Sequence, residues 1–89
     1  MSNQREIWKY PLGMEMTQVS MPKDAEILSC QAQNGTPTLW VLADPEGEKE
    51  YRTFTVLGTG WPIAKDYPVK HVGTFQVPPY VWHVFEVLP

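Results

Sequence analysis

Nine prolines spread along 89 residues limit the folds open to this chain more than any other feature. Each proline fixes its own φ angle, removes a backbone donor and restricts the residue before it, so a long helix has nowhere to form. The segments between the prolines are rich in β-branched and aromatic residues, which are typical of strands. They predict strands over residues 5–10, 17–21, 26–33, 37–43, 51–58, 71–77 and 80–88.

This strand pattern predicts the fold class. We expect residues 1–89 to form one all-β domain, with residues 1–4 flexible, because a chain of this length builds a single core. The architecture is an antiparallel sandwich or a partly open barrel of about six or seven strands, with little or no helix. Asn34-Gly35 favours a type I′ turn between the third and fourth strands. One helical turn over residues 63–66 is the only helical expectation.

Alternation of apolar and polar residues separates a core face from a solvent face in the predicted strands. The expected core residues of the third and fifth strands are Leu28, Cys30, Ala32, Phe54 and Val56. Arg52 is expected at a rim of the same sheet face as Phe54. The last strand is apolar on both faces, so it is either central in a sandwich or covered by a partner chain.

Charge and cysteine content limit the partners. The net charge of −3 has the wrong sign for a protein that binds duplex nucleic acid through its phosphates, although Lys9, Arg52, Lys70 and a histidine could together hold a small anion. Cys30 is the only cysteine and forms no internal disulfide. The N-terminal residues lack the apolar stretch of a signal peptide, and no apolar run is long enough to cross a membrane. We therefore expect a cytoplasmic protein without a membrane partner.

The residues do not predict an enzyme. His71 and His83 lie on different predicted strands, and the chain has none of the spacings CxxC, HxH or HExxH, so we expect no metal and no cofactor. Cys30 and His83 are the one conceivable nucleophile pair, but both alternate with apolar residues on predicted core faces. Most carboxylates fall in turns, which does not favour paired acid and base catalysis.

Other residues suggest a binding site. Gly58-Thr59-Gly60 is either a backbone cradle for an anion or a strand end that needs a positive φ angle. Gln31 and Gln33 are either solvated or a pair of amides that read a ligand, and an exposed Trp61 or Trp82 could stack on a nucleobase. The candidate ligand-binding residues are Lys9, Gln31, Gln33, Arg52, Gly58, Thr59, Gly60, Trp61, Lys70, Trp82 and His83.

Several short motifs follow one another over most of the chain. They are EILSCQAQN at residues 26–34, LW at 39–40, DP at 44–45, GTGWPI at 58–63, GTF at 73–75 and VWHVFE at 81–86. Their order and spacing resemble those of a widespread family of small phage and prophage proteins. In that family the position of Trp61 is often histidine, so a histidine-based role there does not carry over to this chain.

The resemblance implies an accessory protein that acts by non-catalytic binding inside an infected bacterial cell. Such proteins often counter host immunity, so the expected partner is a small anionic nucleotide signal that is sequestered or a host defence protein that is inhibited. Binders of this kind are often homo-oligomers, and the last strand, apolar on both faces, agrees with that expectation. The alternatives are a structural or assembly protein of the virion and a small hydrolase.

Overall fold

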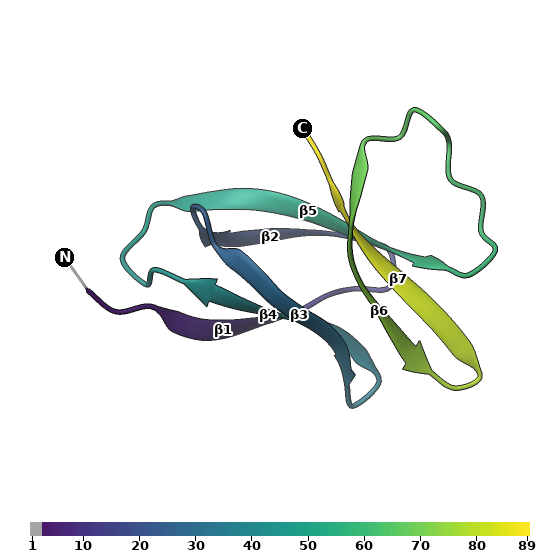
Figure 1. The fold of residues 1–89 in the computed structure, drawn as a ribbon, viewed down its shortest axis with the longest axis horizontal. Coiled ribbons are helices and arrows are strands. Elements are labelled where there is room, and N and C mark those ends of the chain that lie inside the picture. The colour runs from purple at the N-terminus through teal and green to yellow at the C-terminus, as the bar shows by residue number, and fades with distance from the viewer. Residues whose placement is uncertain (1–2) are drawn as a thin grey trace.

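The computed structural model describes residues 3–89 as two facing antiparallel sheets (Figure 1). The strands are β1 (Glu6–Pro11), β2 (Met16–Pro22), β3 (Glu26–Gln33), β4 (Thr36–Ala43), β5 (Lys49–Gly58), β6 (Val69–Val77) and β7 (Tyr80–Val87). One sheet has the order β1-β4-β3 and the other β2-β5-β7-β6. The all-β prediction is confirmed, and the architecture is a sandwich rather than a closed barrel. Residues 1–2, part of the segment expected to be flexible, lie outside the described residues.

The connections follow the local sequence signals with one exception. Asn34 and Gly35 have φ angles of 51° and 80° between β3 and β4, as a type I′ turn requires. The expected helical turn over residues 63–66 is wrong: this stretch is a loop with one hydrogen-bonded turn, in which Tyr67 N donates to Ala64 O (3.1 Å). Pro62 and Pro68 frame the loop and leave too little chain between them for a helix. Residues 3–89 contain no helix long and apolar enough to span a membrane.

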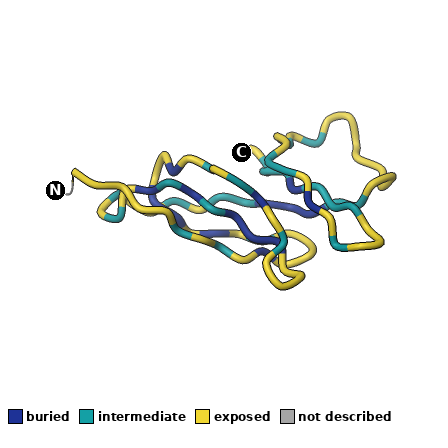
Figure 2. Tube along the Cα trace, turned by 60° about the horizontal axis from the view of Figure 1, so that its bottom comes forward, coloured by how far each residue is buried: buried dark blue, intermediate teal, exposed yellow. Residues whose placement is uncertain are grey.

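The core lies between the two sheets. Its most buried large side chains include Met21, Leu39, Val41, Phe54, Val56 and Val84. Buried positions run along the middle of the strands, whereas the loop of residues 59–68 is almost entirely exposed (Figure 2). Phe54 and Val56 therefore point inward as predicted. Because β7 lies between β5 and β6, its two apolar faces belong to a central strand, which was one of the two expected explanations.

The alternation in β3 departs from the prediction. Cys30 and Ala32 pack in or against the core as expected, but Leu28 is 45% exposed and Ile27 packs against the core in its place. The reason is a register shift between Ile27 and Ser29 in the pairing with β4. One extra residue in a strand reverses the direction of every side chain before it.

The sheets approach each other most closely where β6 crosses β3. A Cβ atom on Gly73 would lie 2.9 Å from Cβ of Cys30, so only glycine fits at this crossing. β6 also carries a register shift between His71 and Gly73. The loop of residues 59–68 and the β6–β7 turn lie at the end of the molecule that is farther from the N-terminus (Figure 1).

Candidate functional site

Three aromatic rings cluster at that end of the molecule. The Trp61 and Trp82 ring centroids are 5.6 Å apart with an interplanar angle of 86°, and the Tyr80 ring lies 5.8 Å from that of Trp82. Trp82 packs against the core, whereas Trp61 is 52% and Tyr80 62% exposed. We call the surface formed by Trp61, Tyr80 and Trp82 the aromatic ledge. Trp82 attaches this surface to the core, and the Trp61 and Tyr80 rings are exposed to solvent.

The glycines at the end of β5 build the ledge. Trp61 N donates to Gly58 O (3.1 Å), and Gly60 has a φ angle of 88°, which defines a type II turn with glycine at its third position. A Cβ atom on Gly58 would lie 2.8 Å from the Trp61 ring, so glycine here lets the indole fold back over the strand. Thr59 N donates to Val81 O (3.3 Å). The positive-φ turn is thus realised, and the N–H groups of Thr59 and Trp61 are occupied internally, which does not favour an anion cradle.

Both histidines lie in one chain of hydrogen bonds on the outer face of the four-stranded sheet. Thr74 Oγ1 is 3.0 Å from His71 Nε2 and 3.0 Å from His83 Nδ1. Thr59 Oγ1 is 2.7 Å from His83 Nε2 and donates to Val81 O (3.3 Å). Each ring nitrogen of His83 thus has one threonine hydroxyl as its hydrogen-bond partner. These hydrogen bonds fix the orientation of the His83 ring.

Arg52 lies at the edge of the core, away from the aromatic ledge, and each nitrogen of its guanidinium group donates a hydrogen bond. Its Nε and Nη2 atoms donate to the two carboxylate oxygens of Glu86 at 2.7 Å each, and Nη1 donates to Ala25 O (2.8 Å) and to Met21 Sδ (3.6 Å). The two charged side chains are only 18% and 15% exposed. The hydrogen bonds that Arg52 donates to the Glu86 carboxylate raise the pKa of Arg52, and burial opposes that rise. Arg52 thus lies at the edge of the core as expected, but its guanidinium is already paired and does not favour phosphate binding.

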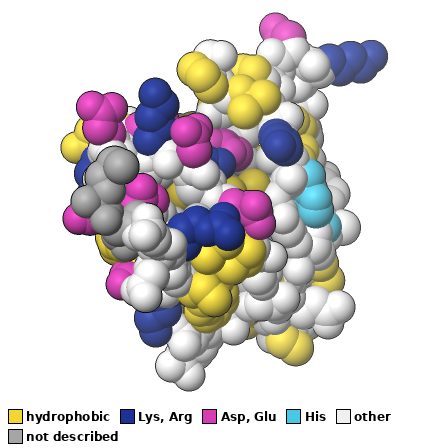
Figure 3. Space-filling view, turned by 60° about the vertical axis from the view of Figure 1, so that its left-hand side comes forward, with side chains coloured by type: hydrophobic (Ala, Val, Ile, Leu, Met, Phe, Trp, Pro, Cys, Tyr) yellow, Lys and Arg dark blue, Asp and Glu magenta, His cyan; other side chains and the backbone are white. Residues whose placement is uncertain are grey.

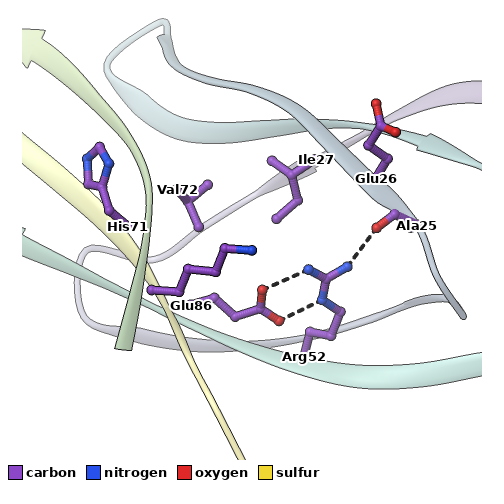
Figure 4. A pocket seen from close by; sticks show the side chains of 8 residues that line it. Ala25, Glu26, Ile27, Arg52, His71, Val72 and Glu86 are labelled. Atoms are coloured by element: carbon purple, nitrogen blue, oxygen red, sulfur yellow. Dashed lines mark hydrogen bonds and ion pairs between the residues drawn. The ribbon is translucent and has the colours of Figure 1, made fainter. Parts of the chain in front are cut away.

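A cavity of about 340 Å³ lies beside this ion pair (Figure 4). Its lining includes Lys70 and Arg52, which were expected to hold an anion, and also Glu26 and Glu86. Lys70 of β6 lies opposite Glu86 of β7 in the strand register. The positive and negative groups balance, so the cavity does not select for an anion.

A smaller cavity of about 250 Å³ lies on the outer face of the three-stranded sheet. It is lined by Lys9, Pro11, Gln33, Asn34, Thr36 and Thr38, and no carboxylate is among these residues. Lys9 Nζ donates to Gln33 Oε1 (2.9 Å). Gln31 is exposed on the same face of β3 as Gln33, because residues two apart in a strand point to the same side. The two glutamines lie opposite Thr38 and Thr36 of β4. Two of the predicted ligand residues, Lys9 and Gln33, therefore meet here.

The predicted ligand-binding residues fall at three separate places instead of one. The ledge end of the four-stranded sheet holds Gly58, Thr59, Gly60, Trp61, Trp82 and His83; the ion-pair cavity holds Arg52 and Lys70; the outer face of the three-stranded sheet holds Lys9, Gln31 and Gln33. Sequence reasoning missed Tyr80, Thr74 and Glu86. Glu86 had a usable signal, because it is the one charged residue between Tyr80 and Leu88 in an apolar strand and so called for a buried partner.

Cys30 and His83 do not form a reactive pair. Cys30 is buried on the inner face of β3, and burial raises the pKa of its thiol to about 11. His83 is on the outer face of β7, and both of its ring nitrogens are engaged with threonine hydroxyls. Among residues 3–89, no group of three or more His, Cys, Asp or Glu side chains is placed to hold a metal ion.

The surface carries no large patch of one charge on the face drawn in Figure 3. Acidic and basic side chains are mixed there, and apolar side chains lie exposed among them (Figure 3). This mixture agrees with the small net charge of −3. This face therefore gives no electrostatic basis for binding a long polyanion.

The fold and the site thus define a small all-β sandwich with an exposed aromatic surface. The chain belongs to the DUF7352 family, a domain of unknown function whose family model matches residues 3–89. No curated protein and no solved structure matches the chain.

Proposed function

We propose that this protein acts by binding another protein without catalysing a reaction, and that the aromatic ledge is the contact surface. The single observation that carries the proposal is the exposure of Trp61 and Tyr80 around a partly buried Trp82. Tryptophan and tyrosine dominate the binding energy of protein interfaces, because they bury a large apolar area and lose little conformational entropy.

The rigidity of the ledge supports this proposal. Trp61 is held by the Gly58–Trp61 turn and by its edge-to-face contact with Trp82, so its ring is ordered before a partner arrives. A surface that is already ordered pays less entropy on binding. The two rings stand nearly perpendicular, at 86°, so they do not form the parallel slot that would clamp a nucleobase.

The biological role in this proposal is that of a phage or prophage accessory protein, in the cytoplasm of the infected cell, which inhibits a host defence protein. It rests on the resemblance of motifs such as GTGWPI at residues 58–63 and VWHVFE at residues 81–86 to small phage proteins. These two motifs also contain the glycines and both tryptophans of the ledge. The buried thiol of Cys30 and the occupied ring of His83 support a role without chemistry.

A second candidate function is sequestration of a small anionic nucleotide. The observation that favours it is the cavity around Lys9 and Gln33, whose lining offers an ammonium group, amides and hydroxyls and contains no carboxylate. Its volume of about 250 Å³ suits a phosphate group better than a whole nucleotide, so the rest of the ligand would lie on the surface.

The test uses the tagged full-length chain expressed in bacteria that carry the defence system a phage must overcome. We expect the wild-type chain to raise the plating efficiency of the phage and to retain a host protein in equal molar amount. Trp61→Ala/Tyr80→Ala should lose both properties, with the affinity falling at least about thirtyfold. Tyr51→Ala, which removes an aromatic ring of 71% exposure elsewhere on the surface, is the matched control and should behave like the wild type.

Other outcomes point to the other functions. Retention of the host protein by the folded Trp61→Ala/Tyr80→Ala variant would overturn the assignment of the ledge. A nucleotide released unchanged from the purified chain by denaturation, and lost in Lys9→Ala, would favour sequestration. Release of a converted product would identify a hydrolase, and co-sedimentation with phage particles would identify a virion protein.

A further inference from the structure

The four strand edges of the sandwich differ in how well they are protected. Edge strands resist pairing with other chains when they carry charges, prolines or bulges, or when another element covers them. β1 carries Glu6, Lys9 and Pro11, which discourage pairing. β3 and β6 each contain a register shift and lie against each other.

β2 is less protected than these strands, because it has neither a charge nor a bulge, and its one proline, Pro22, is the last residue of the strand. Its sequence MTQVSMP contains no charged residue, and its pairing with β5 has no register shift. It is the last strand of its sheet, with no other strand of residues 3–89 beyond it. Met16, Gln18 and Ser20 are exposed on its outer face, and Val19 points into the core.

The backbone of β2 presents free groups at regular positions. Val56 N donates to Glu15 O (3.2 Å) and Lys23 N donates to Glu48 O (2.6 Å), so the ladder with β5 extends one residue beyond each end of β2. In an antiparallel ladder the residues bonded to one neighbour alternate with those directed to the other. The odd-numbered residues of β2 therefore bond to β5, and the N–H and C=O groups of Gln18 and Ser20 point toward the open edge.

We propose that two copies of this chain form a dimer by antiparallel pairing of their β2 strands about a two-fold axis at Val19. In this register Gln18 of one copy lies opposite Ser20 of the other, so their outward N–H and C=O groups satisfy each other. Pro22 ends the pairing on each side, because it has no N–H to donate. The two four-stranded sheets become one continuous sheet, and the aromatic ledge of each copy stays free.

The charges that flank β2 favour the same register. Glu15 and Lys23 lie equally far from Val19 on the two sides, so each Glu15 meets Lys23 of the second copy. Both residues are exposed, and within the described residues neither forms an ion pair in the single chain. Each copy carries a net charge of −3, which opposes association in general. Pairing through the uncharged β2 avoids like charges along the strand itself and places opposite charges at its two ends.

The first test measures the oligomeric state of the full-length chain by sedimentation equilibrium over a wide concentration range. The wild-type chain should sediment as a dimer. Gln18→Lys/Ser20→Lys places two lysine pairs opposite each other and should raise the dimer dissociation constant at least about tenfold. The control Ile7→Lys/Gln31→Lys adds the same charge to exposed positions of the three-stranded sheet and should leave the dimer unchanged. Circular dichroism checks that both variants are folded.

The second test identifies the register through the flanking charges. Glu15→Lys and Lys23→Glu each replace two attractions by two repulsions and should weaken the dimer severalfold. Glu15→Lys/Lys23→Glu restores opposite charges and the original net charge, and should restore the dimer. A monomeric wild-type chain, or a dimer that is indifferent to Gln18→Lys/Ser20→Lys, would overturn the proposal. A dimer that loses affinity in the double swap as much as in both single variants would refute the register.

Discussion

Arg52 is the residue whose role changes most between sequence and structure. The sequence makes it a free cation that could hold a phosphate, whereas the structure joins it to Glu86 by two hydrogen bonds of 2.7 Å and to the start of β3 through Ala25 O. The ion pair joins the neighbouring strands β5 and β7, and the bond from Arg52 to Ala25 O ties this sheet to the residue just before β3 in the other sheet. A cation held this way contributes to the fold, because its removal leaves a carboxylate unpaired in a mostly buried place.

Arg52→Ala should therefore lower the free energy of unfolding by about 2–4 kcal/mol, as expected for a largely buried carboxylate that has lost its partner. Lys70→Ala is the matched control, because Lys70 lies beside the same Glu86 but is exposed, and it should change stability by less than about 0.5 kcal/mol. Urea denaturation followed by circular dichroism measures both. Equal effects of the two substitutions would show that the ion pair does not stabilise the fold.

At the scale of the elements, the crossing of β3 and β6 sets how the sheets meet. Gly73 leaves room for Cys30 there, and the register shifts in both strands turn their side chains at the same region. Bulges and glycines of this kind bend and twist a strand, so they adjust the angle at which one sheet lies on the other.

Gly73→Ala should lower the free energy of unfolding by about 1–3 kcal/mol, because the new methyl group would lie 2.9 Å from Cβ of Cys30. A double-mutant cycle with Cys30→Gly measures how much of this loss comes from the contact with Cys30. In the Cys30→Gly background the added cost of Gly73→Ala should largely disappear, since the opposing Cβ atom is gone. If the cost of Gly73→Ala is the same in both backgrounds, the close approach is not its source.

At the scale of the whole molecule, the two sheets share one core, to which both contribute fully buried side chains such as Leu39 of β4 and Phe54 of β5. Among residues 3–89, no further strand or helix packs on the outer face of either sheet. A sheet needs packing on one face for stability, so neither sheet should persist when the other unfolds.

We expect unfolding to be a single cooperative transition. Trp8 and Trp40 report on the three-stranded sheet, and Trp61 and Trp82 report on the four-stranded sheet. Two variants, each with one of these pairs changed to Phe, should show the same denaturation midpoint by fluorescence and by circular dichroism within each variant. Separate fluorescence and circular dichroism midpoints in either variant would show that the sheets unfold independently.

Local features of this protein could be predicted from the sequence. All seven strands form close to the predicted residues, and Asn34-Gly35 forms the predicted hairpin turn. The inward direction of Phe54 and Val56 follows from the alternation in β5. These features depend on prolines, turn residues and side-chain period, which act between neighbours in the chain and are therefore visible in the residue order.

The candidate site could be predicted only in part. Trp61 and Trp82 were named as binding residues, but their contact with each other comes from the way the Gly58–Trp61 turn folds back on β7, where Tyr80 lies beside Trp82. Lys9 of β1 and Gln33 of β3 were named separately, and they meet across β4, which lies between their strands in one sheet. Arg52 and Lys70 share a cavity whose carboxylates the cationic pattern alone did not indicate.

Residue order thus settled which segments become strands, where they turn and which side chains are apolar or charged. Folding in three dimensions settled which of those side chains meet, as with Arg52 and Glu86, 34 residues apart. The physical reason is that strand patterns repeat every two residues whatever lies opposite, so they do not encode the pairing between distant strands. A single bulge, such as the one that exposes Leu28, changes the face of a side chain without any mark in the residue pattern.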